Sequence, residues 1–398
     1  MSLFSAVEMA PRDPILGLNE QFNADTNPNK VNLGVGVYFD ENGKLPLLQC
    51  VQAAEKAMMD SPKPRGYLPI DGIAAYDAGV KALVFGADSE TVKSGRVATV
   101  QAIGGTGGLK VGADFLKRLN PGAKVLISDP SWENHRALFT EAGFTVESYP
   151  YYDGANHGIN FVGMIAALKS AAPGTIVVLH ACCHNPTGYD IASVQWDEVV
   201  AVVKERNLTA FLDMAYQGFA HGLAQDGAAV HKFVAAGLNF LVSTSFSKSF
   251  SLYGERVGAL SVLCQTKDEA DRVLSQLKIM IRTNYSNPPT HGGAVVAAVL
   301  GNPELRALWE TELAAMRQRI KQMRSLLVEK LKTAGVKKDM NFITEQIGMF
   351  SYSGLTKDQM VRLRNEFGVY GTDTGRMCVA ALNRQNIDYV CASIAKVV

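Results

Sequence analysis

A lysine in the segment SFSKSFSLYGERVG (245–258) has the surroundings of a reactive amine. Lys248 follows an apolar run that we predict to be a strand, and hydroxyl and aromatic residues flank it. Partial burial lowers the pKa of a lysine and makes its amine a usable nucleophile. Ser245, Ser247 and Arg256 lie nearby, and hydroxyls with one guanidinium suit a phosphate dianion. Taken alone, Lys248 is better explained as a loop lysine that reaches solvent, and only its neighbours favour a reactive amine.

An acidic residue ends a second apolar run, TAFLDMAYQGF (209–219). Asp213 closes the predicted strand, and Tyr216 follows three residues later. A buried carboxylate needs a partner, and the protonated nitrogen of a pyridine ring would be one. A helix N-cap or a structural ion pair is an equally open interpretation of this segment.

Two further motifs offer groups for binding oxygen atoms. GGTGG (104–108) opens a predicted helix, where the backbone of Gly105 and the hydroxyl of Thr106 could hold a phosphate. Such a cluster suggests a dinucleotide site just as well when it is taken alone. In HNPTG (184–188), Asn185 could point its amide at a ligand, although turn chemistry also explains this motif.

Aromatic and basic residues in other segments are further candidates for binding a ligand. Trp132 in DPSWENH could stack on a ring or belong to the core. His135 and His180 are expected to be supporting residues near strand ends. Arg282 and Arg376 lie among apolar or small residues, where an unpaired guanidinium is costly. Each of these arginines is therefore either a carboxylate clamp or part of a structural salt bridge.

The composition excludes several classes of protein. Among 398 residues, 39 Lys and Arg balance 38 Asp and Glu, which argues against a nucleic-acid partner. Six cysteines without CxxC spacing, and the absence of HExxH, predict no metal site and a reduced, cytoplasmic protein. We expect no signal peptide and no membrane span, because the most apolar run, AVVAAVL (294–300), is too short.

Short apolar segments alternate with helical ones in the middle of the chain. This pattern predicts an α/β fold with a mostly parallel sheet that helices cover on both faces. Ligands of such sheets lie beyond the carboxyl ends of the strands, where Lys248, Asp213 and Asn185 are expected. The predicted strands are 124–129, 175–181, 209–215, 241–247 and 257–263.

Both ends of the chain are expected to form a smaller α+β domain. Prolines and polar residues predict an irregular arm over 1–30, and a long uninterrupted helix is predicted over 302–334. The predicted domains are an arm with part of the small domain (1–45), a large cofactor-binding domain (46–310) and a small C-terminal domain (311–398).

A phosphate cradle, a ring platform, a buried acid and an activated lysine together specify pyridoxal 5′-phosphate. The sequence also resembles the class I aminotransferases of fold type I, over nearly its whole length. Within the aspartate aminotransferase family it is most similar to bacterial aromatic-amino-acid (tyrosine) aminotransferases. The motifs that carry the resemblance are VNLGVGVY, GYLPIDG, DPSWENH, HNPTG, FLDMAYQGF, SFSKSFSLYGERVG, IRTNYSNPP and GRMCVA.

The resemblance implies a role for each cofactor-binding residue. Lys248 would hold the cofactor's aldehyde as a Schiff base and then move the substrate's proton. Asp213 would pair with the pyridinium, and Tyr216 with Asn185 would bind the ring oxygen. The ring would stack on Trp132. The residues implied to hold the phosphate are Gly105, Thr106, Ser245, Arg256 and, from the other subunit, Tyr67.

The resemblance also implies how substrates bind. Arg376 would clamp the α-carboxylate, and Gly36 would line the pocket. Arg282 of the other subunit would meet the distal carboxylate of a dicarboxylic substrate. The expected assembly is therefore a homodimer with shared active sites, and the expected partners are amino acids and 2-oxo acids.

Two apolar residues bear on the substrate. Phe39 and Leu45 stand where polar residues are expected in the aspartate-specific branch, and apolar side chains there would line a pocket that accepts an aromatic ring. The sequence thus predicts ping-pong transamination of tyrosine, phenylalanine and also aspartate with 2-oxoglutarate, with Arg282 swinging outward for aromatic substrates. The alternatives are an aspartate-specific aminotransferase and, from GGTGG alone, an NAD-dependent dehydrogenase.

Overall fold

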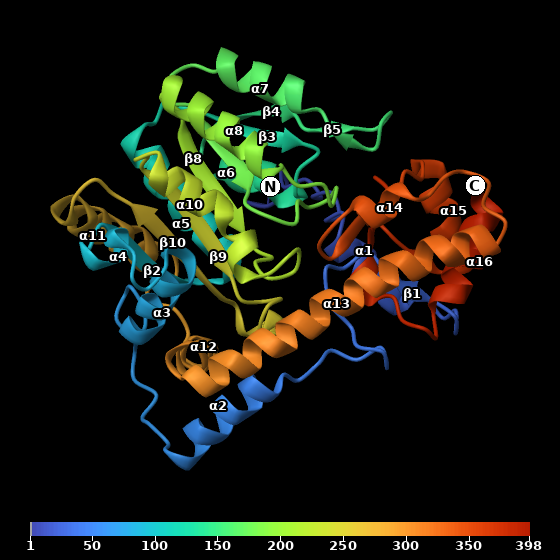
Figure 1. Ribbon diagram of the computed structural model, residues 1–398, viewed down its shortest axis with the longest axis horizontal. Helices are drawn as coiled ribbons and strands as arrows, with labels where there is room; N and C mark the ends of the chain where they lie inside the picture. Colours follow the sequence, from blue (N-terminus) through green and yellow to red (C-terminus); the bar gives the residue numbers. More distant parts are fainter. Residues whose placement is uncertain (1) are drawn as a thin grey trace.

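A seven-stranded sheet forms the centre of the larger part of the molecule (Figure 1). The computed structural model describes residues 2–398. The strand order is β2-β10-β9-β8-β7-β3-β4, and all neighbours are parallel except β10, which is antiparallel to both β2 and β9. The predicted α/β fold with a mostly parallel sheet is therefore confirmed. The strands are β2 (Val97–Ile103), β3 (Lys124–Asp129), β4 (Thr145–Pro150), β7 (Ile176–His180), β8 (Thr209–Met214), β9 (Phe240–Ser245) and β10 (Val257–Leu263).

Helices cover both faces of this sheet because its strands are apolar on both sides. In β8, Phe211 packs into one cluster of buried side chains, whereas its neighbours Ala210 and Leu212 pack into the other. Each fully buried side chain of this size contributes about 1.5–3 kcal/mol. One cluster includes α5 (Gly104–Leu119), α6 (Glu133–Glu141) and α11 (Lys267–Asn284). The other includes α3 (Ala74–Phe85), α7 (Phe161–Ser170), α8 (Ser193–Glu205) and α10 (Ala228–Ala235).

One long helix, α13 (Pro303–Thr333), connects the sheet with the C-terminal part of the molecule (Figure 1). Asn302 caps it by accepting hydrogen bonds from the N–H groups of Glu304 and Leu305, and Pro303 suits its first position. Its contacts run from α2 (Gln49–Asp60) and α12 (His291–Gly301) to α14 (Phe342–Glu345) and α16 (Ile387–Val397). The predicted boundary at 310 falls inside this helix, so the division into domains stays a prediction.

The two ends of the chain meet in the C-terminal part. There β1 (Val31–Asn32) pairs in parallel with β12 (Val369–Tyr370), and β11 (Phe350–Tyr352) pairs antiparallel with β13 (Arg376–Cys378). The remaining elements are α4 (Glu90–Lys93), α9 (Leu223–Asp226), α15 (Lys357–Phe367), β5 (Tyr152–Asp153), β6 (Gly158–Ile159), η1 (Tyr253–Glu255) and η2 (Val379–Ala381).

The prediction of an irregular arm over residues 1–30 was wrong in part. Helix α1 (Leu16–Ala24) lies within it, and the Asp13 carboxylate accepts hydrogen bonds from the N–H groups of Ile15 and Leu16 at its start. The prolines that suggested an irregular segment precede or follow this helix, where they are compatible with it.

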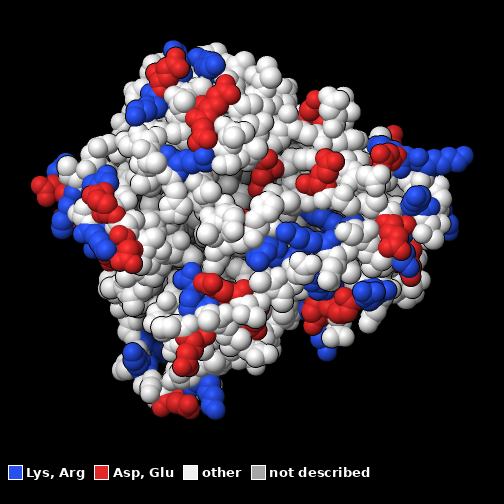
Figure 2. Space-filling view, viewed as in Figure 1, with Lys and Arg blue, Asp and Glu red and all other residues white. Residues whose placement is uncertain are grey.

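The surface carries both signs of charge. On the face shown in Figure 2, basic and acidic side chains are mostly interspersed, and a short run of basic side chains crosses the middle of the view. This mixture agrees with a formal net charge of +1. Within residues 2–398, no helix combines the length and the apolar character needed to cross a bilayer.

Candidate active site

A cavity of about 170 Å³ lies beyond the carboxyl ends of β7, β8 and β9, beside the first turn of α5. Eleven of the predicted site residues line it, and they come from distant parts of the chain. They are Gly36, Gly105, Thr106, Trp132, Asn185, Asp213, Tyr216, Ser245, Lys248, Arg256 and Arg376. The structure thus brings together the lysine, the acid, the anion-binding groups and one of the two arginines.

The amine of Lys248 is prepared for chemistry near neutral pH. Its Nζ lies 4.7 Å from the centre of the Tyr216 ring. Removal from bulk water lowers the pKa of Lys248 to about 8, while the Asp213 carboxylate acts in the opposite direction. The nearby guanidinium groups of Arg256 and Arg376 lower this pKa further. A substantial fraction of the lysine is therefore uncharged at physiological pH and able to act as a nucleophile or base.

Asp213 is a buried carboxylate that a histidine supports. Its Oδ2 lies 2.8 Å from His135 Nε2, and His135 Nδ1 lies 2.9 Å from Ser131 Oγ. Burial would raise the pKa of Asp213, but the hydrogen bond with His135 and nearby cations bring it below its ordinary value. Asp213 therefore remains an anion that faces the cavity, as a cationic ring nitrogen requires.

His180 extends this cluster. Burial and the neighbouring His135 lower the pKa of His180 to about 3, so the ring is neutral. Neither of its ring nitrogens has a hydrogen-bond partner within residues 2–398, and His180 lines the cavity. The expected supporting role of His135 fits this arrangement, whereas His180 lies directly on the cavity wall.

The anion-binding end of the cavity forms where α5 begins. The first N–H groups of a helix have no intrahelical partner, so those at Gly105 and Thr106 are available to a phosphate. Gly104 has φ +73°, a backbone conformation that favours glycine, and a Cβ there would lie 2.5 Å from Arg256 Nη2, so another residue would be strained and would displace the Arg256 guanidinium. Ser245 and Arg256 also line the cavity and add a hydroxyl and a positive charge.

Arg376 is a buried guanidinium with unused donors. Its Nη1 donates to Asn185 Oδ1 at 3.0 Å, and its Nη2 donates to the Gly34 carbonyl at 2.6 Å. The guanidinium carbon lies 4.5 Å from the centre of the Phe350 ring. Because Nε is buried without a partner, the group can still receive a carboxylate.

Four predicted site residues lie outside this cavity. Tyr67 is 96% exposed, Leu45 is 42% exposed and Arg282 is exposed as well. Phe39 is half-buried and packs against the core beside the loop that follows it. The single chain therefore does not bring these four residues to the cavity.

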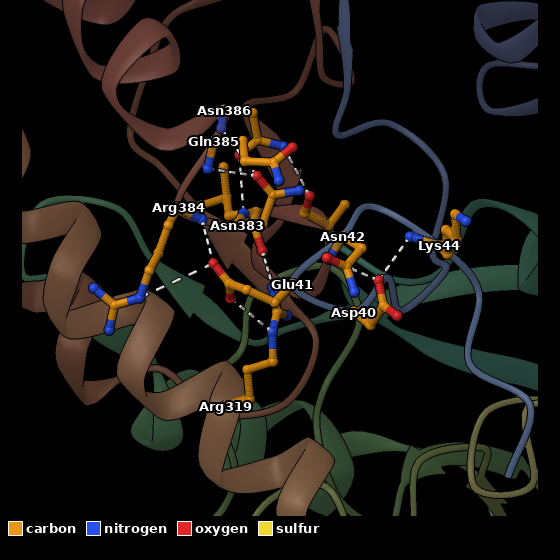
Figure 3. Close-up of polar contacts among 11 residues, drawn as sticks. Asp40, Glu41, Asn42, Lys44, Arg319, Asn383, Arg384, Gln385 and Asn386 are labelled. Carbon is orange, nitrogen blue, oxygen red and sulfur yellow. Dashed lines mark hydrogen bonds and ion pairs between the residues drawn. The ribbon is translucent and has the colours of Figure 1, made fainter.

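The loop between Phe39 and Leu45 is fixed by a polar network (Figure 3). Glu41 Oε1 accepts a hydrogen bond from the backbone N–H of Arg384 at 2.7 Å, and Oε2 lies 3.4 Å from Arg319 Nε on α13. Arg319 also donates to the Leu382 carbonyl at 2.6 Å. Glu41 thus connects the loop both to α13 and to the turn before α16.

We expect Glu41→Ala to loosen this loop without unfolding the protein. Glu41 is 44% exposed but Arg319 is only 13% exposed, so the variant leaves a largely buried guanidinium without its acid. We expect the free energy of unfolding to fall by about 1–3 kcal/mol and the melting temperature to fall by a few degrees. Amide hydrogen exchange in residues 39–45 and 383–386 should become faster. Asn42→Ala is the matched control, since its exposed side chain lies in the same loop. Equal exchange in wild type and Glu41→Ala would contradict this role for Glu41.

Sequence reasoning missed four apolar residues of the cavity wall. They are Ile15, Leu109, Ala215 and Phe350. Apolar side chains at a site look like core residues in a sequence, so their type gives no signal. The position of Ala215 directly after β8 was the one available indication.

The family model for aminotransferases of class I and II matches residues 28–394, and the chain belongs to this family. An aspartate aminotransferase of Pseudomonas aeruginosa is 62% identical over 397 residues, which cover 100% of both chains. Among solved structures, an aromatic-amino-acid aminotransferase of Burkholderia pseudomallei, covalently bound to pyridoxal phosphate, has a TM-score of 0.97. Its sequence is 67% identical, and the match covers 100% of both chains.

A third relative is also a solved structure. It is an aromatic amino acid aminotransferase of Psychrobacter that was cocrystallised with aspartic acid. Its TM-score is 0.96 at 48% identity, and the match covers 99% of both chains. The family assignment confirms the predicted aminotransferase and decides against the NAD-dependent dehydrogenase.

Proposed function

We propose that this chain is a pyridoxal-phosphate-dependent aminotransferase that accepts phenylalanine, tyrosine and aspartate, with 2-oxoglutarate as the amino acceptor. The observation that carries the proposal is the amine of Lys248, with a lowered pKa, in a cavity shared with the buried anion of Asp213 and the buried cation of Arg376. The cofactor, when bound, supplies an aldehyde for the amino group and an electron sink in its ring.

The residues of the cavity fit that cofactor. The turn at Gly105 and Thr106, with Ser245 and Arg256, provides donors and positive charge for its phosphate. Asp213 provides the negative charge that its ring nitrogen needs. Trp132 lines the same cavity and offers a flat surface to the ring. Tyr216 and Asn185 are then left to hydrogen-bond the ring oxygen.

Lys248 and Arg376 act on the substrate in this proposal. The free donors of Arg376 bind the α-carboxylate and so orient the Cα–H bond of the amino acid. Lys248 Nζ would remove the Cα proton and later return it as a general acid, which a pKa near 8 permits. Both amino-acid substrates and 2-oxo acids carry the carboxylate that Arg376 binds, so one site serves both halves of a ping-pong cycle.

The ability to accept both aromatic substrates and aspartate depends on the apolar part of the cavity wall. Ile15 and Phe350 are apolar residues that line the cavity together with Gly36, and this surface accommodates an aromatic ring. Phe39 and Leu45 lie outside this cavity, at the two ends of the loop that Glu41 connects to α13. Relatives named for aspartate and relatives named for aromatic amino acids are similar to this chain over nearly its whole length.

A homodimer with shared sites is part of the proposal. Tyr67 is almost fully exposed, and four apolar residues of the N-terminal arm are exposed too: Leu3, Phe4, Val7 and Met9. Exposed apolar segments of this kind mark contact surfaces. A partner subunit would bring its Tyr67 to the phosphate and its Arg282 to a distal carboxylate, where Arg282 swings outward for aromatic substrates.

We further propose that the enzyme is cytoplasmic. All six cysteines are free and buried. Unpaired cysteines are usual in a reducing compartment.

The test is a single-turnover absorbance experiment on the cofactor-loaded enzyme. Phenylalanine or aspartate is added separately without a 2-oxo acid, and conversion of the bound cofactor to its amine form is followed. We expect fast conversion with both substrates, and Arg282→Ala should slow conversion only with aspartate. Conversion with aspartate alone would instead indicate an aspartate-specific enzyme. No conversion with either would contradict the proposed function.

A further inference from the structure

A carboxylate of the protein itself lies beside Arg376. Glu133 Oε2 is 3.9 Å from Arg376 Nη1, and the Arg376 side chain is only 1% exposed. Glu133 is the first residue of α6 and directly follows Trp132, which lines the cavity. The clamp for the substrate's carboxylate therefore has an anion next to it before any substrate binds.

Both partners of this pair have unused hydrogen-bonding capacity. Glu133 Oε2 and Arg376 Nε are buried, and neither has a hydrogen-bond partner among residues 2–398. A separation of 3.9 Å is too long for a hydrogen bond, so the pair interacts only through its charges. Leaving buried donors and acceptors of this kind unpaired is unfavourable. Arg376 thus keeps its directional donors for another ligand while Glu133 offsets part of its charge.

Glu133 also lines a second cavity, which contains basic side chains. This cavity has a volume of about 330 Å³, and Arg12 and Arg364 line it together with Glu133. Asp373 lies in the same wall and pairs with Arg364 at 3.0 Å. Glu133 therefore remains compatible with the fold when a second carboxylate reaches Arg376, although the two anions then repel each other.

We propose that Glu133 sets the affinity for substrates by competing electrostatically with their α-carboxylate for Arg376. This inference rests on the role of Arg376 in the proposed function. Every amino-acid and 2-oxo-acid substrate carries the same α-carboxylate, so Glu133 weakens the binding of all of them by the same factor. An interaction that is equal in the ground state and the transition state changes KM but not kcat. Glu133 thereby favours release of the product in each half of the cycle, a 2-oxo acid in the first half and an amino acid in the second.

The test measures binding of unreactive carboxylates to the cofactor-loaded enzyme by calorimetry. 3-Phenylpropionate and succinate resemble the two substrate classes but lack the amino group. Glu133→Gln keeps the size of the side chain and removes its charge. From the Coulomb interaction of two anions a few ångströms apart at a partly exposed site, we expect both ligands to bind about three- to tenfold more tightly. In steady-state assays, KM for phenylalanine and aspartate should fall by a similar factor while kcat changes less than about twofold.

Two variants control for general effects. Glu141→Gln lies at the opposite end of α6, about 12 Å along the helix, and should leave both dissociation constants unchanged. Glu133→Asp withdraws the carboxylate from Arg376 by one methylene group. The dissociation constants of both ligands should fall by a smaller factor than in Glu133→Gln. Glu133→Asp also provides an independent measurement where Glu133→Gln does not fold.

Several results would overturn the inference. Unchanged or weaker binding in Glu133→Gln would show that Glu133 does not oppose the carboxylate. Tighter binding of only one ligand would show that Glu133 recognises the side chain instead. Arg376→Lys separates this inference from the proposed function, because it should weaken both ligands. Equal binding in wild type and Arg376→Lys would contradict the clamp itself, whatever the result at Glu133.

Discussion

Lys248→Ala is expected to slow the half-reaction with phenylalanine or aspartate by at least about 10⁴-fold. A positioned proton-transfer group contributes about 10²–10⁴-fold, and loss of the covalent attachment of the cofactor adds to this. No other lysine lines the cavity within residues 2–398, so nothing in this chain replaces the amine. Single-turnover absorbance measurements on wild type and variant, each saturated with pyridoxal phosphate, give the ratio directly.

The control for this prediction is Lys248→Arg. It keeps a positive charge, but a guanidinium stays protonated over the whole pH range of an enzyme assay and cannot accept a proton. We therefore expect it to be as inactive as Lys248→Ala. Lys248→Ala should keep the melting temperature of the wild type to within a few degrees, because the charged form of the lysine is already disfavoured by burial. Lys248→Arg buries a permanent charge and should melt at a lower temperature. A variant that retained more than about one hundredth of the wild-type rate would exclude Lys248 as the proton carrier.

The chemistry of the site was predictable because its polar residues follow apolar runs. Asp213 comes at the end of the mostly apolar strand β8, and Lys248 comes three residues after β9, which begins with the apolar residues Phe240–Val242. In a parallel sheet the ends of such strands meet at one edge, so residue type and position together indicated a shared cavity. The apolar wall formed by Ile15 and Phe350 carries no such signal, because these side chains resemble the core.

Contacts between distant segments were not predictable from local patterns. β1 and β12 pair although Val31 and Val369 stand near opposite ends of the chain, and Arg376 donates to the Gly34 carbonyl across a similar separation. Such contacts depend on the complete fold. The expected positions of Tyr67 and Arg282 depend on a second chain, and these two roles therefore stay predictions.

The position of Glu133 shows a further limit of the sequence. Directly after Trp132, an acidic residue in the first turn of α6 is explained by the positive end of the helix dipole. Only the fold shows that the same carboxylate lies 3.9 Å from Arg376, which is more than 240 positions further along the chain. A residue with an ordinary local explanation thus gains its proposed effect on substrate affinity only through tertiary structure.

Asp213→Asn is expected to reduce the half-reaction rate by about 10²–10⁴-fold, because a neutral amide no longer stabilises a positive charge on the ring nitrogen. The variant should fold normally, since the asparagine oxygen can still accept a hydrogen bond from His135. A second effect concerns Lys248 in the cofactor-free protein. Asp213 raises the pKa of Lys248, so its removal should lower that pKa below the wild-type value of about 8.

The sign of this second effect follows from charge. The carboxylate of Asp213 stabilises the ammonium form of Lys248, so without it the lysine loses its proton at a lower pH. The measurement is the pH dependence of acylation at Lys248 by an amine-directed reagent, with the modified peptide quantified by mass spectrometry. The midpoint should lie near 8 in wild type and lower in Asp213→Asn. The exposed Asp197→Asn is the control and should titrate like wild type. A higher midpoint in Asp213→Asn would mean that Asp213 does not act on Lys248 as an anion.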